Sequence, residues 1–172
     1  MTWPVTYTPG AVLTAAQLTA MMNPPTCQAY LSGSLPIASG ATWKLLTLDG
    51  EAWDSTGDMH NNTTNPSRVY ARGTGKYLLQ AVIGWPSNAT DNRRLTIMKN
   101  SNGDTTLATG VDLGEDRQTP VSGVTTYNRF DAMVALTDGD YIEAFVSQTS
   151  GSSLTLNTGA RFTALTLTGI SA

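Results

Sequence analysis

The sequence predicts an all-β sandwich, with a jelly roll as the favoured arrangement. Thr supplies roughly one residue in six, and β-branched side chains fit the pleated surface of a sheet. Short runs of alternating apolar and polar residues follow one another between closely spaced turn sequences, without helical periodicity in the interior of the chain. The 16 Gly and 8 Pro residues are spread along all 172 positions, and 40 % of the residues are hydrophobic. This composition suits one folded domain and excludes a disordered chain.

Residues 1–26 differ from the rest and are expected to form an N-terminal anchoring arm with a short helix. Prolines and aromatic residues near the start predict extended backbone. Thr14 and Gln17 then have the spacing of a capping box, and Pro24 and Pro25 end the helix after about two turns. A helix this short is not stable alone, so it must pack on its own domain or on another protein. We favour another protein, contacted through the apolar arm residues Trp3, Tyr7, Leu13, Leu18, Met21 and Met22.

Residues 27–172 are expected to form the sandwich head. The Asn-Gly pair within residues 100–104 predicts a tight hairpin. Roughly eight to ten short strands without an interior helix indicate a sandwich. Alternating patterns predict strands at 76–85, 93–99, 125–137, 140–148 and 161–168, and shorter or less regular patterns predict strands at 28–32, 42–48, 68–72 and 107–113. Long polar loops are expected at 49–66, 86–92 and 114–123.

Two of these strands are apolar on both faces. Residues 76–85 place Leu78 and Val82 opposite the expected core face, and residues 140–148 place Phe145 there. An antiparallel sandwich normally leaves one face of each sheet to water. Covering the second face needs a further layer, and a symmetric copy of the same chain supplies one. We therefore expect a homo-oligomer.

Charge and composition exclude several function classes. The net charge is −3 and the 10 Lys and Arg residues are scattered, so no surface for nucleic acid is expected. Apolar runs are far shorter than the roughly 20 residues that span a bilayer, so we expect no membrane partner. No signal peptide is visible, which favours a protein that is made and kept in the cytoplasm until assembly. A single Cys and a single His leave little for disulfides, metal sites or acid–base chemistry.

The candidates for chemistry are weak, and we expect no enzyme and no cofactor. Asp49, Glu51, Asp54 and Asp58 gather in one polar stretch, which is typical of a solvated loop, with a Ca²⁺ site as the alternative. His60 lies in the same stretch. It is expected to be an exposed loop residue, since no Gly-x-Ser-x-Gly elbow accompanies it.

Aromatic side chains near the polar loops are candidate receptor contacts. Trp53 and Trp85 are expected at strand ends or in loops, where an exposed ring could stack on a sugar or grip a protein. Packing in the core or at its rim is the alternative. Together with His60, they form the predicted receptor-contact residues. The three long loops would contact the receptor. Cys27 is expected to be a small buried hydrophobe.

Four motifs in residues 27–170 resemble the globular C1q/tumour necrosis factor-like family. They are Gln28-Ala29-Tyr30-Leu31, Gly75-Lys76-Tyr77-Leu78-Leu79, Asp138-Gly139-Asp140-Tyr141-Ile142 and Arg161-Phe162-Thr163-Ala164-Leu165-Thr166-Leu167. The resemblance implies a C1q-like jelly roll of about ten strands that assembles as a compact trimer. We expect the trimer interface to include the residues Tyr30, Leu78, Val82, Tyr127, Met133 and Phe162.

The arm resembles a different group of proteins. Thr2-Trp3 followed by Pro9-Gly10-Ala11-Val12-Leu13-Thr14-Ala15-Ala16-Gln17-Leu18 is similar to the opening of many tailed-bacteriophage virion proteins. Together the two resemblances imply a non-enzymatic structural protein on the virion surface. Its homotrimeric head would dock on other virion proteins, of the tail or capsid, through residues 1–26. A minor tail or tail fibre protein is favoured; a capsid decoration protein, or a tail-tip module that binds a host-surface glycan or protein for host attachment, is the alternative.

Overall fold

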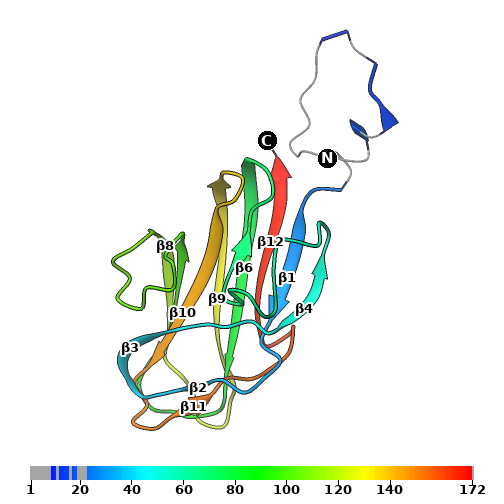
Figure 1. The fold of residues 1–172 in the computed structure, drawn as a ribbon. Coiled ribbons are helices and arrows are strands. Elements are labelled where there is room, and N and C mark those ends of the chain that lie inside the picture. Colours follow the sequence, from blue (N-terminus) through cyan, green and yellow to red (C-terminus); the bar gives the residue numbers. More distant parts are fainter. Residues whose placement is uncertain (1–8, 11, 16, 19–22, 172) are drawn as a thin grey trace.

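The structure, a computed structural model, describes residues 9–10, 12–15, 17–18 and 23–171 and shows a sandwich of two β-sheets (Figure 1). In chain order the strands are β1 (Thr26–Tyr30), β2 (Pro36–Ile37), β3 (Gly40–Leu45), β4 (Gly50–Asp54), β5 (Val69–Tyr70), β6 (Gly75–Trp85), β7 (Arg93–Lys99), β8 (Val111–Gln118), β9 (Thr126–Leu136), β10 (Tyr141–Gln148), β11 (Leu154–Thr155) and β12 (Thr163–Ser171). The first sheet has the order β4-β1-β12-β6-β9. The second has the order β3-β10-β7-β8, and β5 also pairs with β10.

The core lies between the two sheets and uses one face of each. On β6, Tyr77, Leu79 and Ile83 point inward and are fully buried. Leu95 and Ile97 of β7 belong to the same buried cluster from the second sheet. Burying one such side chain is worth about 1.5–3 kcal/mol, so this shared cluster is the main source of the head's stability.

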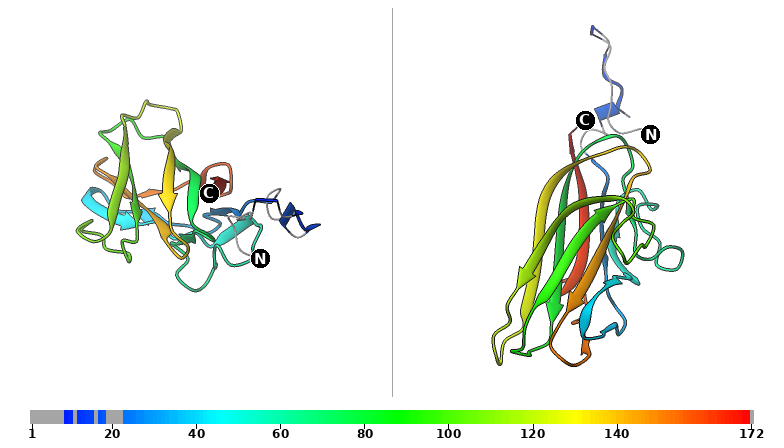
Figure 2. Two further views of the ribbon diagram at one scale, coloured as in Figure 1. Left: turned by 90° about the horizontal axis from the view of Figure 1, so that it is seen from above. Right: turned by 90° about the vertical axis from the view of Figure 1, so that its left-hand side faces the viewer.

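The chain of the head begins with β1 and finishes with β12 at the same end of the sandwich. β1 pairs with β12, and the Gly169 N–H donates to the Pro25 carbonyl at 2.8 Å. We call this the terminal end and the opposite one the far end; Figure 2 shows the described arm residues projecting beyond the terminal end. Of these residues, Val12, Leu13 and Leu18 are exposed, Val12 to 91 %. The described arm residues between 9 and 18 therefore do not fold back onto the sandwich, whereas Pro25 is buried against it.

The predicted capping box is present at Thr14 and Gln17. The Gln17 N–H donates to Thr14 Oγ1 at 3.2 Å, and the Thr14 N–H donates to Gln17 Oε1 at 2.9 Å. The described residues Ala15, Gln17 and Leu18 are helical, and the Leu18 N–H donates to the Thr14 carbonyl oxygen at 3.0 Å. None of the described residues forms a helix that could cross a bilayer. Much of the predicted helix, and the predicted contacts Trp3, Tyr7, Met21 and Met22, lie outside the described residues.

Most predicted strands are confirmed. β7 has the predicted bounds, and β6, β9 and β10 differ from prediction by no more than one residue at each end. The strands predicted at 28–32, 42–48, 68–72 and 161–168 are present with shifted bounds. Two predictions were wrong. The strand expected at 107–113 is β8 at 111–118, which takes up half of the loop expected at 114–123, and the loop expected at 49–66 contains β4.

Hydrogen bonds that no periodic pattern reveals explain these errors. Asp104 accepts hydrogen bonds from the Thr106 N–H and hydroxyl and from the Thr109 N–H, which fold residues 100–110 into a loop and hold the pKa of Asp104 at about 2. Leu107 has a positive φ of 59° within that loop, which a strand does not allow. β4 lacks alternation and forms because the edge of β1 supplies a partner for it.

Candidate functional site: the outward face of the first sheet

The outward face of the first sheet, which we call the open face, is built by alternation along β1, β12, β6 and β9, with β4 added at one edge. On β6 the inward residues are Tyr77, Leu79, Ala81 and Ile83, so the residues between them point away from the core. Strand register places the outward residues in cross-strand rows. The far row is Tyr30, Ala164, Val82 and Arg129; the middle row is Gln28, Thr166, Gln80 and Asp131; the terminal row is Thr26, Thr168, Leu78 and Met133.

The polar side chains of the open face largely satisfy one another. Gln28 Nε2 donates to Thr166 Oγ1 at 3.1 Å, and Gln80 Nε2 donates to Asp131 Oδ1 at 2.9 Å. The hydroxyls of Thr26 and Thr168 lie 3.0 Å apart, a hydrogen bond in which either can donate. Because these polar atoms already have partners, covering the face with another surface carries a small desolvation penalty.

Two aromatic rings lie flat on the open face over glycines. A Cβ added at Gly50 would lie 2.6 Å from ring atoms of Tyr30, and one added at Gly84 would lie 3.2 Å from Cε1 of Tyr127. The glycines thus make room for the rings against the backbone. Such aromatic packing over a sheet glycine is a device that supports the strand and gives the face a flat apolar surface.

The structure brings the predicted interface residues together on this one face. Tyr30, Leu78, Val82, Tyr127 and Met133 all occupy outward positions of the first sheet. Phe162, which is 40 % exposed, directly precedes β12 at the far end, with its carbonyl beside Gly84. Contact of these six residues with other copies stays a prediction.

The outward face of the second sheet is instead covered by the chain's own loops, and we call it the covered face. Phe145 and Met98 are buried there although neither belongs to the core cluster between the sheets. Loop 100–110 packs over this side, because a Cβ added at Gly103 would lie 3.2 Å from Leu45 of β3. The expectation that residues 140–148 need a partner copy was therefore wrong: two loops of the same chain supply the extra layer.

A buried carboxylate joins those two loops to the covered face. Glu143 of β10 is fully buried and accepts hydrogen bonds from the Ser101 hydroxyl at 2.6 Å, the Gly103 N–H at 2.8 Å and the Ser67 hydroxyl at 2.9 Å. Arg68 Nε pairs with the same carboxylate at 3.1 Å. Burial alone would raise the pKa of Glu143, but these hydrogen bonds and the guanidinium hold it below its ordinary value.

Sequence reasoning did not identify Glu143, although a signal for it exists. A single acidic residue stands in a strand that is apolar on both faces, where a charge is tolerated only with partners. Its donors come from loops 55–68 and 100–110, which are distant in sequence. The partners therefore could not be predicted from local pattern.

Two of the three predicted receptor contacts are buried, which corrects their assignment. Trp85 is fully buried and its indole N–H donates to Asn128 Oδ1 at 2.8 Å. His60 is 5 % exposed, with Nδ1 2.8 Å from the Arg68 carbonyl oxygen and Nε2 2.9 Å from the Leu48 carbonyl oxygen. Both ring nitrogens are engaged with the backbone, so neither is available to a ligand or a metal. Trp53 remains exposed, to 45 %.

The acidic cluster is largely engaged in local structure. Asp54 accepts five hydrogen bonds from the segment that follows it, among them the N–H groups of Met59 and His60, which explains why this segment folds inward. Burial alone would raise the pKa of Asp54, but these donors lower it. Asp49 accepts from the N–H groups of Ser32 and Gly33, and Asp58 pairs with Arg72.

Cys27, Glu51 and Asp54 have ligand atoms within 4.8 Å of one another, the one such group among the described residues. The Cys27 side chain is buried as predicted. Burial, with the two acids adding to it, raises the pKa of the Cys27 thiol, so the thiolate that a metal needs is disfavoured. The Asp54 oxygens already accept several protein donors. The group does not have the character of a metal site.

The predicted recognition loops do not form one surface. Residues 86–92 follow Trp85, and residues 119–125 precede Thr126. Trp85 and Thr126 pair at the far end, so both loops lie there. Residues 55–68 lead instead to β5, at the terminal end.

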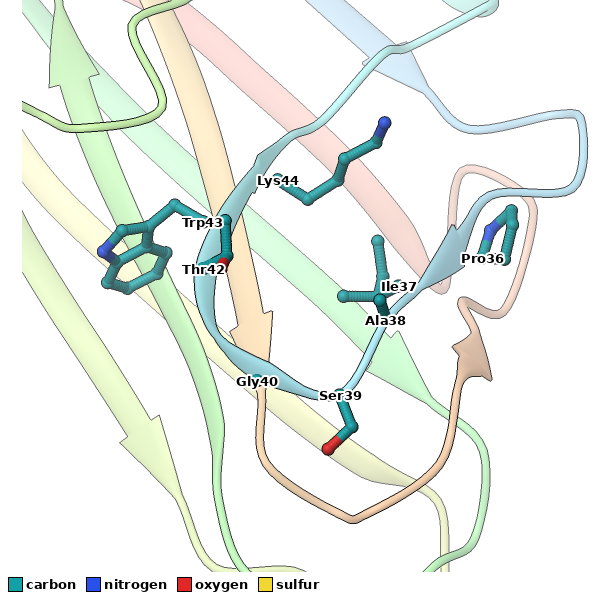
Figure 3. A pocket seen from close by; sticks show the side chains of 8 residues that line it. All are labelled: Pro36, Ile37, Ala38, Ser39, Gly40, Thr42, Trp43 and Lys44. Atoms are coloured by element: carbon teal, nitrogen blue, oxygen red, sulfur yellow. The ribbon is translucent and has the colours of Figure 1, made fainter.

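A shallow pocket of about 210 Å³ lies along residues 36–44, and Figure 3 shows Trp43 and Lys44 pointing to opposite sides of β3. Arg94 lies over the Trp43 ring at 4.6 Å. No fully buried polar side chain lines this pocket.

Comparison with known proteins shows the fold. No family model and no curated protein matches this chain. Among solved structures, murine APRIL has a TM-score of 0.62 at 12 % identity, covering 86 % of this chain and 100 % of its own. The Eiger TNF of S. frugiperda has 0.61 at 14 %, covering 87 % and 96 %, and the globular domain of zebrafish complement 1qA has 0.57 at 12 %, covering 85 % and 96 %. The predicted C1q/tumour necrosis factor-like jelly roll is thus confirmed as the fold.

Proposed function

We propose that this chain is a non-enzymatic structural and binding module in which three copies assemble through their open faces. The observation that carries the proposal is the contrast between the two outward faces. The chain buries Phe145 and Met98 on the covered face with its own loops, but leaves Leu78, Val82 and Met133 on the open face without such a layer. Two or more further copies are the economical cover, since cyclic symmetry repeats one contact.

The open face supplies a large part of the area that such contacts require. Its strands have 5, 5, 9, 11 and 11 residues, and at about 4.8 Å by 3.3 Å per residue they span about 650 Å². A stable interface takes about 800 Å² from each partner, and each copy in a trimer takes part in two contacts, so the edges that flank the face must contribute the rest. At about 25 cal/mol per Å² of apolar surface, burying its aromatic and aliphatic side chains supplies the driving force.

The titratable side chains described above support a role without chemistry. Glu143 is saturated by donors, both nitrogens of His60 face backbone carbonyls, and Asp54 accepts five hydrogen bonds. A general acid or base needs a free position directed at a substrate. These groups instead hold loops in place, which fits a scaffold whose activity is assembly.

Light scattering coupled to size-exclusion chromatography tests the trimer. The wild-type chain, of 18.2 kDa, should elute with about three times that mass at micromolar concentration. Leu78→Arg places a charge in the terminal row of the open face and should give a folded monomer with an unchanged circular dichroism spectrum. Val121→Arg, on a far-end loop residue that is 66 % exposed, is the matched control and should remain trimeric. A wild-type monomer would overturn the proposal.

For biological setting, we propose a bacteriophage virion surface, with the head held on tail or capsid proteins through residues 1–26. The phage-like opening sequence and the exposed apolar residues Val12, Leu13 and Leu18 support this. A minor tail or fibre position is favoured, with capsid decoration as the alternative. Leu18→Asp should abolish incorporation into particles without changing the mass of the free oligomer; incorporation at the wild-type level would contradict the docking role.

A host-binding role is the second candidate, favoured by the far end. Val121 and Val124 of the loop between β8 and β9 are 66 % and 55 % exposed at the end opposite the arm. A head anchored by its arm presents this end outward, where a glycan or protein on the host could be contacted. Binding of the purified head to host cells should fall on substitution of both valines by Ser; no binding by the wild type would remove this candidate.

A further inference from the structure

We infer that the two lateral edges of the open face meet in the assembly, so that Met133 of one copy packs on Trp53 of the next. The inference rests on the proposed trimer and specifies its contact. In a cyclic oligomer with more than two copies the interface joins two different patches of the same chain. The open face must therefore carry two complementary patches, one on each side of its central strand β12.

Each edge of the open face carries one large exposed apolar side chain. Trp53 lies on the edge strand β4 and is 45 % exposed, and Met133 lies on the edge strand β9 and is 62 % exposed. Trp53 and Met133 extend the apolar surface of a face that already carries Leu78 and Val82, and a contiguous apolar patch marks an interaction site. The flexible thioether of Met packs favourably against aromatic rings.

The two side chains lie at the same height along the strands. By register Trp53 pairs with Gln28 of the middle row, and its indole N–H donates to Thr26 Oγ1 at 3.3 Å, so the ring extends from the middle row to the terminal row. The register of that row runs from Thr26 through Thr168 and Leu78 to Met133. Rotation about an axis parallel to the strands moves nothing along the strands, so only patches at equal height can meet in neighbouring copies.

Thiol cross-linking tests the contact. In the variant with Trp53→Cys and Met133→Cys, a short bismaleimide should link copies into covalent trimers, visible on a denaturing gel. Four strand spacings, about 19 Å, separate the two positions within one copy, too far for the reagent to span. The native Cys27 is buried and should not react. Either single variant, and the pair Trp53→Cys with Val111→Cys on the second sheet, are the matched controls and should not link.

The outcomes separate this inference from the trimer itself. Covalent trimers in the double variant alone support the contact. A trimer by light scattering that does not cross-link overturns the contact and leaves the proposed assembly intact. Equal cross-linking of the Met133→Cys single variant shows three Met133 side chains meeting one another, which also overturns it. A monomer by light scattering contradicts both proposals.

Discussion

Both outward faces of this sandwich carry apolar side chains, but only one of them is covered by loops of the same chain. Both β6 and β10 carry apolar residues on the side away from the core. On the covered face, loops 55–68 and 100–110 are tied to β10 through Glu143. On the open face, neighbouring side chains pair only with one another, as Gln28 does with Thr166. An apolar outward strand therefore indicates a missing layer, and only the tertiary structure tells whether that layer comes from the same chain.

Truncating one aromatic residue on each face should give the largest difference in stability between the covered face and the open face. Phe145→Ala removes a fully buried ring and should cost about 3–5 kcal/mol in the free energy of unfolding at every protein concentration. Tyr30→Ala removes a half-buried ring of the open face, and its cost should grow with protein concentration as trimers form. Denaturant titrations at several concentrations measure both; identical concentration dependence would contradict the contrast.

The charge that joins the loops to the covered face gives the next largest effect. Glu143→Gln keeps the shape but removes the charge that Arg68 pairs with and puts an NH₂ group among donors. We expect a loss of about 1–3 kcal/mol in the free energy of unfolding. Gln80→Leu on the open face is the control, because it removes a hydrogen bond at the exposed surface, and it should change stability little. Equal losses in the two variants would show that the network contributes nothing specific.

Acid should weaken the covered face through the same carboxylate. The folded-state pKa of Glu143 lies below its ordinary value, so the group stabilises the fold at pH values above the unfolded pKa of about 4.3. This contribution is lost as the pH falls through the folded-state pKa. The midpoint temperature of thermal unfolding (Tm) should therefore fall more steeply between pH 7 and pH 3 for the wild type than for Glu143→Gln. Parallel curves would assign the acid sensitivity to other groups.

The sequence allowed the sandwich, the bounds of β6, β7, β9 and β10 and the open face to be predicted, because period-two alternation directly reports which side of a strand is apolar. Leu78 and Val82 could be placed outward for that reason. The cover over Phe145 could not be predicted, since a pattern does not reveal which distant loop packs on it. His60 and Trp85 were misplaced for a related reason: their burial depends on the backbone carbonyl of Leu48 and on the Asn128 side chain, both brought in by the fold.

The smallest expected effect compares how the faces tolerate added volume at a glycine. A Cβ at Gly50 would lie 2.6 Å from ring atoms of Tyr30, but that ring has solvent beside it and can move outward. A Cβ at Gly110 would lie 2.5 Å from the Lys99 carbonyl oxygen, at a backbone position with φ of 88° that L side chains rarely adopt. Gly50→Ala should thus cost the monomer under about 1 kcal/mol, while Gly110→Ala should cost more, because backbone cannot shift as a ring can. Displacing Tyr30 should also weaken assembly, so a Gly50→Ala variant that remains trimeric at high dilution would place Tyr30 outside the contact between copies.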